Sequence, residues 1–113
     1  MVSESDARRA ALDLPGTVEQ DHHGRPSFRV KGKIFATLWD SNHLNVMVRP
    51  ERIGALVNTR PDVFSEVWWG KRLAAVRVDL GKTNRKELAG VLAEAWHQHA
   101  SSAAERRQVS RKV

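Results

Sequence analysis

Cysteine is absent from this chain, and so is any long hydrophobic segment. Without cysteine the protein has no disulfides, no thiolate nucleophile and no thiolate zinc site, so a hydrophobic core must supply its stability. No run of about 18 apolar residues is present, and residues 2–6 (Val-Ser-Glu-Ser-Asp) do not resemble a signal peptide. We therefore expect a cytoplasmic protein that is neither exported nor inserted into a membrane.

The motifs of common catalytic sites are also missing. No serine occurs in a nucleophile-elbow sequence, no P-loop or dinucleotide fingerprint is present, and carboxylates are not paired at fixed spacing. We expect neither an enzyme nor a bound cofactor. The length of 113 residues suits one compact domain with one core.

Acidic residues are fewer than basic ones, and the positive charge is unevenly placed. The chain carries 19 Lys and Arg against 13 Asp and Glu, a formal net charge of +6. Residues 1–24 hold five acids and two bases, which leaves 17 bases and eight acids, or +9, for the rest. Polyanions, chiefly nucleic acid, are therefore the first partner class to consider.

Helical patterns occupy both ends of the chain. Ser3 is a predicted N-cap, and apolar residues then repeat at helical spacing until Pro15-Gly16 ends the helix. Asn84 is the predicted N-cap of the closing helix, which has one continuous apolar face. A short helix is predicted to begin at Pro50 and to stop by Arg60.

Between the helices the apolar residues alternate, as they do in strands. From Thr17 to about Arg49 the pattern predicts an antiparallel meander, with Ile34, Ala36 and Leu38 on one face and Phe35 on the other. One turn is predicted at Lys31-Gly32, where Gly32 supplies the positive φ that Lys31 resists.

The remaining strand patterns complete a sheet. A further turn is predicted at residues 40–42 (Asp-Ser-Asn), and strands at Val63 to Trp69 and Leu73 to Leu80 are joined through residues 70–72. We predict an α+β fold, a two-layer sandwich in which an antiparallel sheet packs on the N- and C-terminal helices. Residues 1–100 form the predicted domain, and residues 101–113 form a basic, flexible tail.

Several short motifs also carry a family resemblance, from about Leu12 to Trp96. They are residues 14–16 (Leu-Pro-Gly), 23–36 (His-Gly-Arg-Pro-Ser-Phe-Arg-Val-Lys-Gly-Lys-Ile-Phe-Ala), 69–71 (Trp-Gly-Lys), 78–80 (Val-Asp-Leu) and 94–96 (Glu-Ala-Trp). In these motifs the chain resembles the MmcQ/YjbR family of small bacterial proteins. The resemblance implies a CyaY-like fold, shared with frataxin, and DNA binding through paired β-hairpin wings. Frataxin-like iron binding is not expected, because Arg8 and Arg9 interrupt the few acids of the first helix.

Two basic hairpin turns are the predicted nucleic-acid-binding site. We expect their side chains to contact the phosphates of duplex DNA without reading its sequence. Arg29 and Lys31 are predicted to project from the side opposite Val30. The full predicted set is Arg25, Arg29, Lys31, Lys33, Lys71, Arg72 and Arg77, and the tail adds Arg106, Arg107, Arg111 and Lys112. The alternative is that these charges form an ordinary solvated face.

The tryptophans add a second candidate contact. Trp68 and Trp69 are adjacent on a predicted strand, so one ring is expected to point inward and the other outward. In one interpretation, an outward Trp69 ring stacks on an unpaired base. In the alternative interpretation, a helix or the tail covers this ring. Trp96 and Trp39 are predicted core residues, with a strand-end position as the alternative for Trp39.

The histidines suggest a different class of function. His22 and His23 are expected to face opposite sides of a strand, and His97 and His99 to diverge on a helix, so no metal site is predicted. His23 and Arg25 instead suggest a polar pocket between sheet and helix. The alternative to nucleic-acid binding is therefore a module for a small molecule or a partner protein. A monomer is expected, and a second copy that covers the open sheet face is the alternative.

Overall fold

The computed structural model describes residues 1–101 of the chain. Three helices and six strands are arranged in an α+β fold, as predicted. In chain order they are α1 (Glu4–Leu12), β1 (Val18–His22), β2 (Arg25–Val30), β3 (Lys33–Asp40), β4 (His43–Val46), α2 (Pro50–Thr59), β5 (Phe64–Trp69), β6 (Arg72–Asp79) and α3 (Arg85–Ala100). The predicted flexible tail lies, apart from residue 101, outside the described residues.

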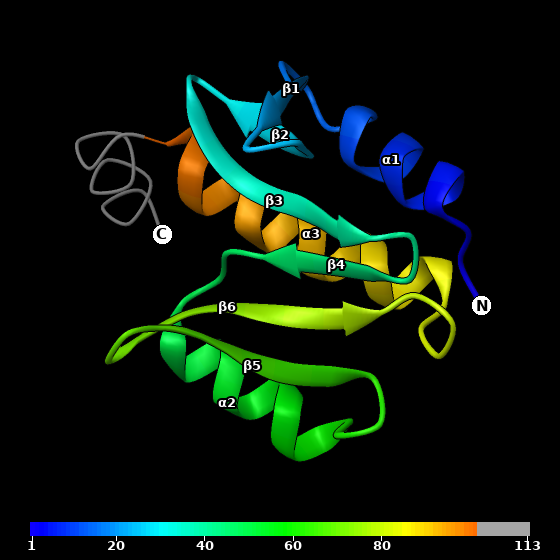
Figure 1. Ribbon diagram of the computed structural model, residues 1–113, viewed down its shortest axis with the longest axis vertical. Helices are drawn as coiled ribbons and strands as arrows, with labels where there is room; N and C mark the ends of the chain where they lie inside the picture. The colour runs from blue at the N-terminus through cyan, green and yellow to red at the C-terminus, as the bar shows by residue number, and fades with distance from the viewer. Residues whose placement is uncertain (102–113) are drawn as a thin grey trace, which may run out of the picture.

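The strands form one antiparallel sheet with the order β1-β2-β3-β4-β6-β5. In Figure 1, α3 runs behind β3 and β4, and α2 runs behind β5 and β6. The first helix, α1, packs against α3. The helices thus cover one face of the sheet and leave the other open, which is the two-layer arrangement expected from the sequence.

The helices begin where local side-chain chemistry satisfies their first N–H groups. In α1, Ser3 is the N-cap as predicted and forms a capping box with Asp6, with the Asp6 N–H donating to Ser3 Oγ at 3.0 Å. In α3, the Glu87 N–H donates to Asn84 Oδ1 at 2.8 Å. Pro50 occupies the first turn of α2, where its missing N–H costs no helical hydrogen bond.

Two hairpin turns carry positive φ at both central residues, the pattern of type I′ turns. His23 and Gly24 have φ of 53° and 82°, and Lys31 and Gly32 have φ of 51° and 77°. The position of the predicted turn at Lys31-Gly32 is therefore confirmed. The expectation that Gly32 alone takes positive φ is wrong, because the twist of the hairpin requires this conformation of Lys31 as well.

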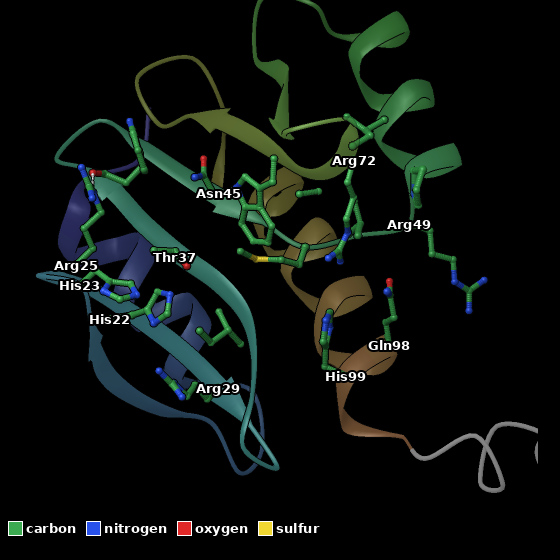
Figure 2. A pocket seen from close by; sticks show the side chains of 18 of the residues that line it. His22, His23, Arg25, Arg29, Thr37, Asn45, Arg49, Arg72, Gln98 and His99 are labelled. Atoms are coloured by element: carbon green, nitrogen blue, oxygen red, sulfur yellow. Dashed lines mark hydrogen bonds between the residues drawn. The ribbon is translucent and has the colours of Figure 1, made fainter.

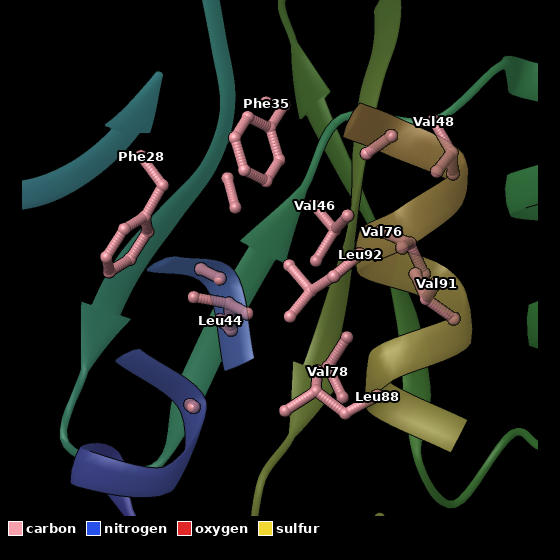
Figure 3. Packing of buried hydrophobic residues seen from close by; sticks show 14 of the residues in the cluster. Phe28, Phe35, Leu44, Val46, Val48, Val76, Val78, Leu88, Val91 and Leu92 are labelled. Atoms are coloured by element: carbon pink, nitrogen blue, oxygen red, sulfur yellow. The ribbon is translucent and has the colours of Figure 1, made fainter. Parts of the chain in front are cut away.

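The core lies between the sheet and the helices (Figure 3). Phe28, Leu44 and Val76 from the sheet face Leu88 and Leu92 from α3, and all five are essentially buried. Trp96 of α3 is only partly buried and packs against this core, and its indole N–H donates to the carbonyl of Pro15 at 2.8 Å. The tryptophan thus ties α3 to the loop that follows α1.

An irregularity in β3 determines which side chains reach the open face. The register passes from Phe28↔Ala36 to Arg29↔Ile34, which leaves Phe35 without a partner in β2. Phe35 and Ala36 are both fully buried. The prediction that these two residues face opposite sides is therefore wrong, because the extra residue shifts the alternation by one place.

None of the helices within residues 1–101 is long and apolar enough to cross a membrane.

Candidate functional site

A cavity of about 870 Å³ opens on the sheet face that the helices do not cover. Strand β4 ends at Val46, whereas β6 begins at Arg72 and pairs with β4 only from Val76 onward. The first residues of β3 and β6 therefore have no strand between them, and the end of α3 is reached through this gap. Figure 2 shows His99 and Gln98 of α3 on one side and the β1–β2 hairpin on the other.

The charged side chains that line the cavity are all basic. Within residues 1–101 no aspartate or glutamate contributes to its wall, and three histidines join four arginines there. These residues are His22, His23, Arg25, Arg29, Arg49, Arg72 and His99. Within residues 1–101, none of the four arginines lies within ion-pair distance of a carboxylate. The cavity therefore presents concentrated, uncompensated positive charge.

Arginines from β2 and β6 both pack over the Trp39 ring at the edge of the cavity. The Arg25 guanidinium carbon lies 4.0 Å from the ring centroid, and that of Arg77 lies 4.6 Å away. Arg25 Nε also donates to the Trp39 carbonyl at 3.0 Å, and Arg77 Nε donates to Asn45 Oδ1 at 2.9 Å. Trp39 is 38% exposed, so it takes the strand-end position and not the core position.

The carboxylate nearest to this stack in the sequence is held in a turn. Asp40 accepts hydrogen bonds from the Asn42 N–H at 2.8 Å and from His43 Nδ1 at 2.9 Å. The Asn42 N–H, together with His43, lowers the pKa of Asp40 below its ordinary value. The Asp40 carboxylate thus makes these hydrogen bonds at the predicted turn of residues 40–42.

The two adjacent tryptophans are both half exposed. Trp68 is 52% exposed and Trp69 is 53% exposed, so the prediction that one ring points inward is wrong. The pairing of β5 with β6 shifts between Val67 and Trp68, and this irregularity disrupts the alternation of faces. Only Trp69 of the two lines the cavity, with the Arg72 guanidinium carbon 5.7 Å from its ring centroid.

The structure places the predicted basic residues of the first hairpin at different surfaces. Arg25 and Arg29 line the cavity, and Arg29 Nε donates to Ser27 Oγ at 3.2 Å. Lys31 lines a second cavity together with Val30, so the expectation that it projects on the side of Arg29 is wrong. Its left-handed conformation and the shifted β2–β3 register account for the difference. Lys33 lines neither of these two cavities.

The second hairpin supplies the opposite wall. Arg72 lines the cavity and Arg77 reaches its edge through the Trp39 stack, whereas Lys71 does not line it. Figure 2 shows Arg25 and Arg29 on one side and Arg72 on the other, beside Arg49. The two basic ribbons therefore converge on one cavity through arginines near the turns, and the lysines of the turns lie outside it.

The histidines were only partly predicted. His22 and His23 have ring centroids 4.4 Å apart, so the expectation that they face opposite sides is wrong, because His23 belongs to a type I′ turn. His99 lines this cavity and His97 the second one, which confirms that they diverge. In the described part of the chain no three metal-ligating side chains gather. His23 and Arg25 both line this cavity.

Sequence reasoning missed Arg49, His22 and His99 as cavity residues. Arg49 precedes the proline that starts α2, and it was interpreted only as the end of the meander. A residue before proline is held in an extended conformation, which was the available signal that Arg49 leaves the helix axis. Nothing in the sequence indicates that the end of α3 meets the open sheet face.

The fold and cavity define a class of small α+β proteins with one open, basic sheet face. A family model described as YjbR matches residues 12–98, which is most of the chain. The protein belongs to the YjbR family, and the resemblance expected from the sequence is confirmed.

A solved structure supports the fold. The crystal structure of Deinococcus radiodurans protein DR2400, which has a DUF419 domain, is 22% identical to this chain. The two superpose with a TM-score of 0.75 over 97% of this chain and 89% of that one. At this identity the likeness shows a shared fold. No curated protein matches the chain.

Proposed function

We propose that this protein binds nucleic acid through the open face of its sheet. The observation that carries the proposal is the cavity wall, in which four arginines and three histidines occur without one acid. Arginine forms bidentate, charge-assisted hydrogen bonds with phosphate oxygens. Because no carboxylate of the described residues pairs with them, these groups are available to a polyanionic backbone.

The proposed contact residues differ in part from those expected from the sequence. Arg25, Arg29 and Arg72 are retained, and Arg49 is added. Arg77 holds Trp39 and extends the basic surface beyond the cavity. The turn lysines Lys31, Lys33 and Lys71 add long-range attraction and not direct contacts in the cavity. Contacts to phosphate carry no sequence information, so binding is expected to be largely independent of sequence.

A small anionic molecule is the second candidate ligand. The volume of about 870 Å³ lies in the range of ligand cavities, roughly 300–1,000 Å³, and His23 and Arg25 both line it. In either case we propose a binding protein and not an enzyme. A nucleic-acid partner and the lack of cysteine both favour a cytoplasmic location.

A salt titration tests the proposed function. The affinity for a labelled DNA duplex is measured by fluorescence anisotropy between about 50 and 200 mM salt. Each phosphate contact contributes about −0.9 to the slope of log affinity against log salt. Changing Arg29→Ala and Arg72→Ala together is expected to flatten this slope by nearly two units and to weaken binding.

The matched control removes the same charge elsewhere. Arg9 of α1 and Lys86 of α3 are exposed and do not line the cavity. Their double alanine variant is expected to keep the wild-type slope to within about half a unit. If wild type binds neither duplex nor single strand, the proposed function is wrong. Equal slope changes in the two double variants mean that general charge, and not the cavity, is responsible.

A further inference from the structure

The floor of the cavity carries polar groups that the protein itself does not use. Thr37 is 8% exposed and Asn45 is 4% exposed, and both line the cavity. Thr37 Oγ1 has no hydrogen-bond partner within residues 1–101, and the Asn45 oxygen is occupied by Arg77. The Asn45 amide nitrogen therefore remains as a donor beside a free hydroxyl. Among the described residues only Thr17 Oγ1 is fully buried without a partner, so the polar atoms of Thr37 and Asn45 are accessible from the cavity and can hydrogen-bond with a ligand that fills it.

An aromatic surface accompanies these groups. Trp69 lines the same cavity, and the described cation–π contact with Arg72 accounts for one face of its ring. No second ring or cation within the described residues covers the other face. Trp39 is less available for this role, because the guanidinium groups of Arg25 and Arg77 both lie over its ring. Trp69 is thus the stacking surface of the cavity.

We propose that the cavity accepts one unpaired nucleotide. Its base stacks on Trp69 and its edge bonds to Thr37 and Asn45, while arginines of the rim hold the phosphate. A base inside a duplex has both faces stacked and its pairing edge used. It therefore reaches neither Trp69 nor a floor that is less than a tenth exposed. This inference rests on the proposed function. A duplex contacts only the rim of the cavity, so the ligand inferred here is a single strand or a nucleotide extruded from a duplex.

Adjacent tryptophans provide a matched test. Trp68 and Trp69 have the same chemistry and nearly the same exposure, but only Trp69 lines the cavity. Anisotropy is measured with a labelled single-stranded 12-mer and with the duplex of the same sequence, at about 50 mM salt. Wild type is expected to bind the single strand more tightly. Trp69→Ala should weaken single-strand binding at least about fivefold and Trp68→Ala less than about twofold.

A second variant removes a floor group without changing its shape. Thr37→Val replaces the free hydroxyl by a methyl group, and it should weaken single-strand binding about threefold to tenfold. Duplex binding should be unchanged in all of these variants. Thermal unfolding of each variant checks that the fold is retained, and a Trp69→Phe variant that recovers part of the affinity would support stacking.

The outcomes separate this inference from the proposed function. One outcome is that single strand and duplex bind equally and that Trp69→Ala and Trp68→Ala lose the same affinity. The proposal of an unpaired nucleotide is then wrong, while the proposal of binding through the open face stands. A free nucleoside monophosphate is the third arm. If it binds with the same dependence on Trp69 and Thr37 while the 12-mer does not, the ligand is a small nucleotide and the strand proposal is overturned.

Discussion

The covered and open sides of the sheet use arginine in different ways. On the helix side, Arg8 pairs with Glu19 at 2.8 Å, Arg52 with Glu94 at 2.9 Å and Arg85 with Asp6 at 3.2 Å. On the open face, Arg25 and Arg77 pack on Trp39, and the described residues offer them no carboxylate. The chain thus pairs several arginines with carboxylates on one side, whereas the arginines of the cavity have no such partner within residues 1–101.

Neutral partners allow an arginine to be positioned without losing its charge. A surface ion pair contributes only about 0–1 kcal/mol to stability, and it cancels the field of the cation. A cation–π contact contributes a similar energy, about 0.5–1 kcal/mol at an exposed site, and leaves the net charge intact. The Trp39 stack therefore orders two guanidinium groups for an anion at little cost in stability.

The largest expected effect is on stability, and it differs between the covered and the open side of the sheet. Leu92 is fully buried between α3 and the sheet, whereas Ile34 is only partly buried and lines the cavity. Leu92→Ala is expected to lower the free energy of unfolding by about 2–5 kcal/mol, because it leaves a hole in the core. Ile34→Ala should cost less than about 1.5 kcal/mol. Urea unfolding measures both values, and equal losses would show that the open face belongs to the core.

A carboxylate placed on the open face should remove the difference in arginine pairing between the two sides of the sheet. Asn45→Asp keeps the shape of the side chain and places a negative charge beside Arg77, whose Nε already donates to the same atom at 2.9 Å. The new charge pairs with Arg77 and repels phosphate, so affinity for nucleic acid should fall about tenfold or more. The measurement is anisotropy with the labelled single strand.

Asn58→Asp provides the control for net charge. Asn58 is exposed in α2 and does not line the cavity, so this variant should change affinity less than about twofold at physiological salt. If the two variants lose affinity equally, the nucleic acid does not bind at this cavity. If neither variant loses affinity, the unpaired arginines of the open face have no role in binding.

The elements of this fold could be predicted because their signals are local. Ser3 and Asn84 cap their helices within three residues of chain, and Pro50 fixes the start of α2 in the same way. Turn residues at 31–32 and 40–42 lie between alternating runs. In each case the interacting groups are close in sequence, so the pattern alone indicates the structure.

The cavity could be predicted only in part, because it depends on contacts between distant segments. Arg25, Arg29 and Arg72 were expected to bind, but the register shifts that orient Trp69 and bury Phe35 have no signature in the alternating pattern. A β-bulge is selected by packing on both sides of the sheet. The approach of His99 to the open face likewise depends on where β4 ends, which sequence patterns locate only approximately.

The smallest expected effect tests an ion pair of the covered side by pH. Hydrogen bonds from Ser3 lower the pKa of Asp6 below its ordinary value of 3.8, and the guanidinium of Arg85 adds to this effect. A lowered folded-state pKa means that Asp6 stabilises the fold above the unfolded-state value and loses this contribution as the pH falls through the folded-state value. Asp6→Asn should therefore be less stable than wild type at about pH 6, and the difference should shrink toward about pH 3.

The control for this titration is a carboxylate at the opposite end of the same helix. Asp13, the C-cap of α1, makes no ion pair within the described residues, so Asp13→Asn should not reproduce the loss at about pH 6. Urea unfolding at each pH gives the free energies. A difference between wild type and Asp6→Asn that stays constant with pH would show that the capping geometry stabilises α1 without the charge. The pairing with Arg85 would then be incidental, and neutralisation on the covered side would concern the electric field and not stability.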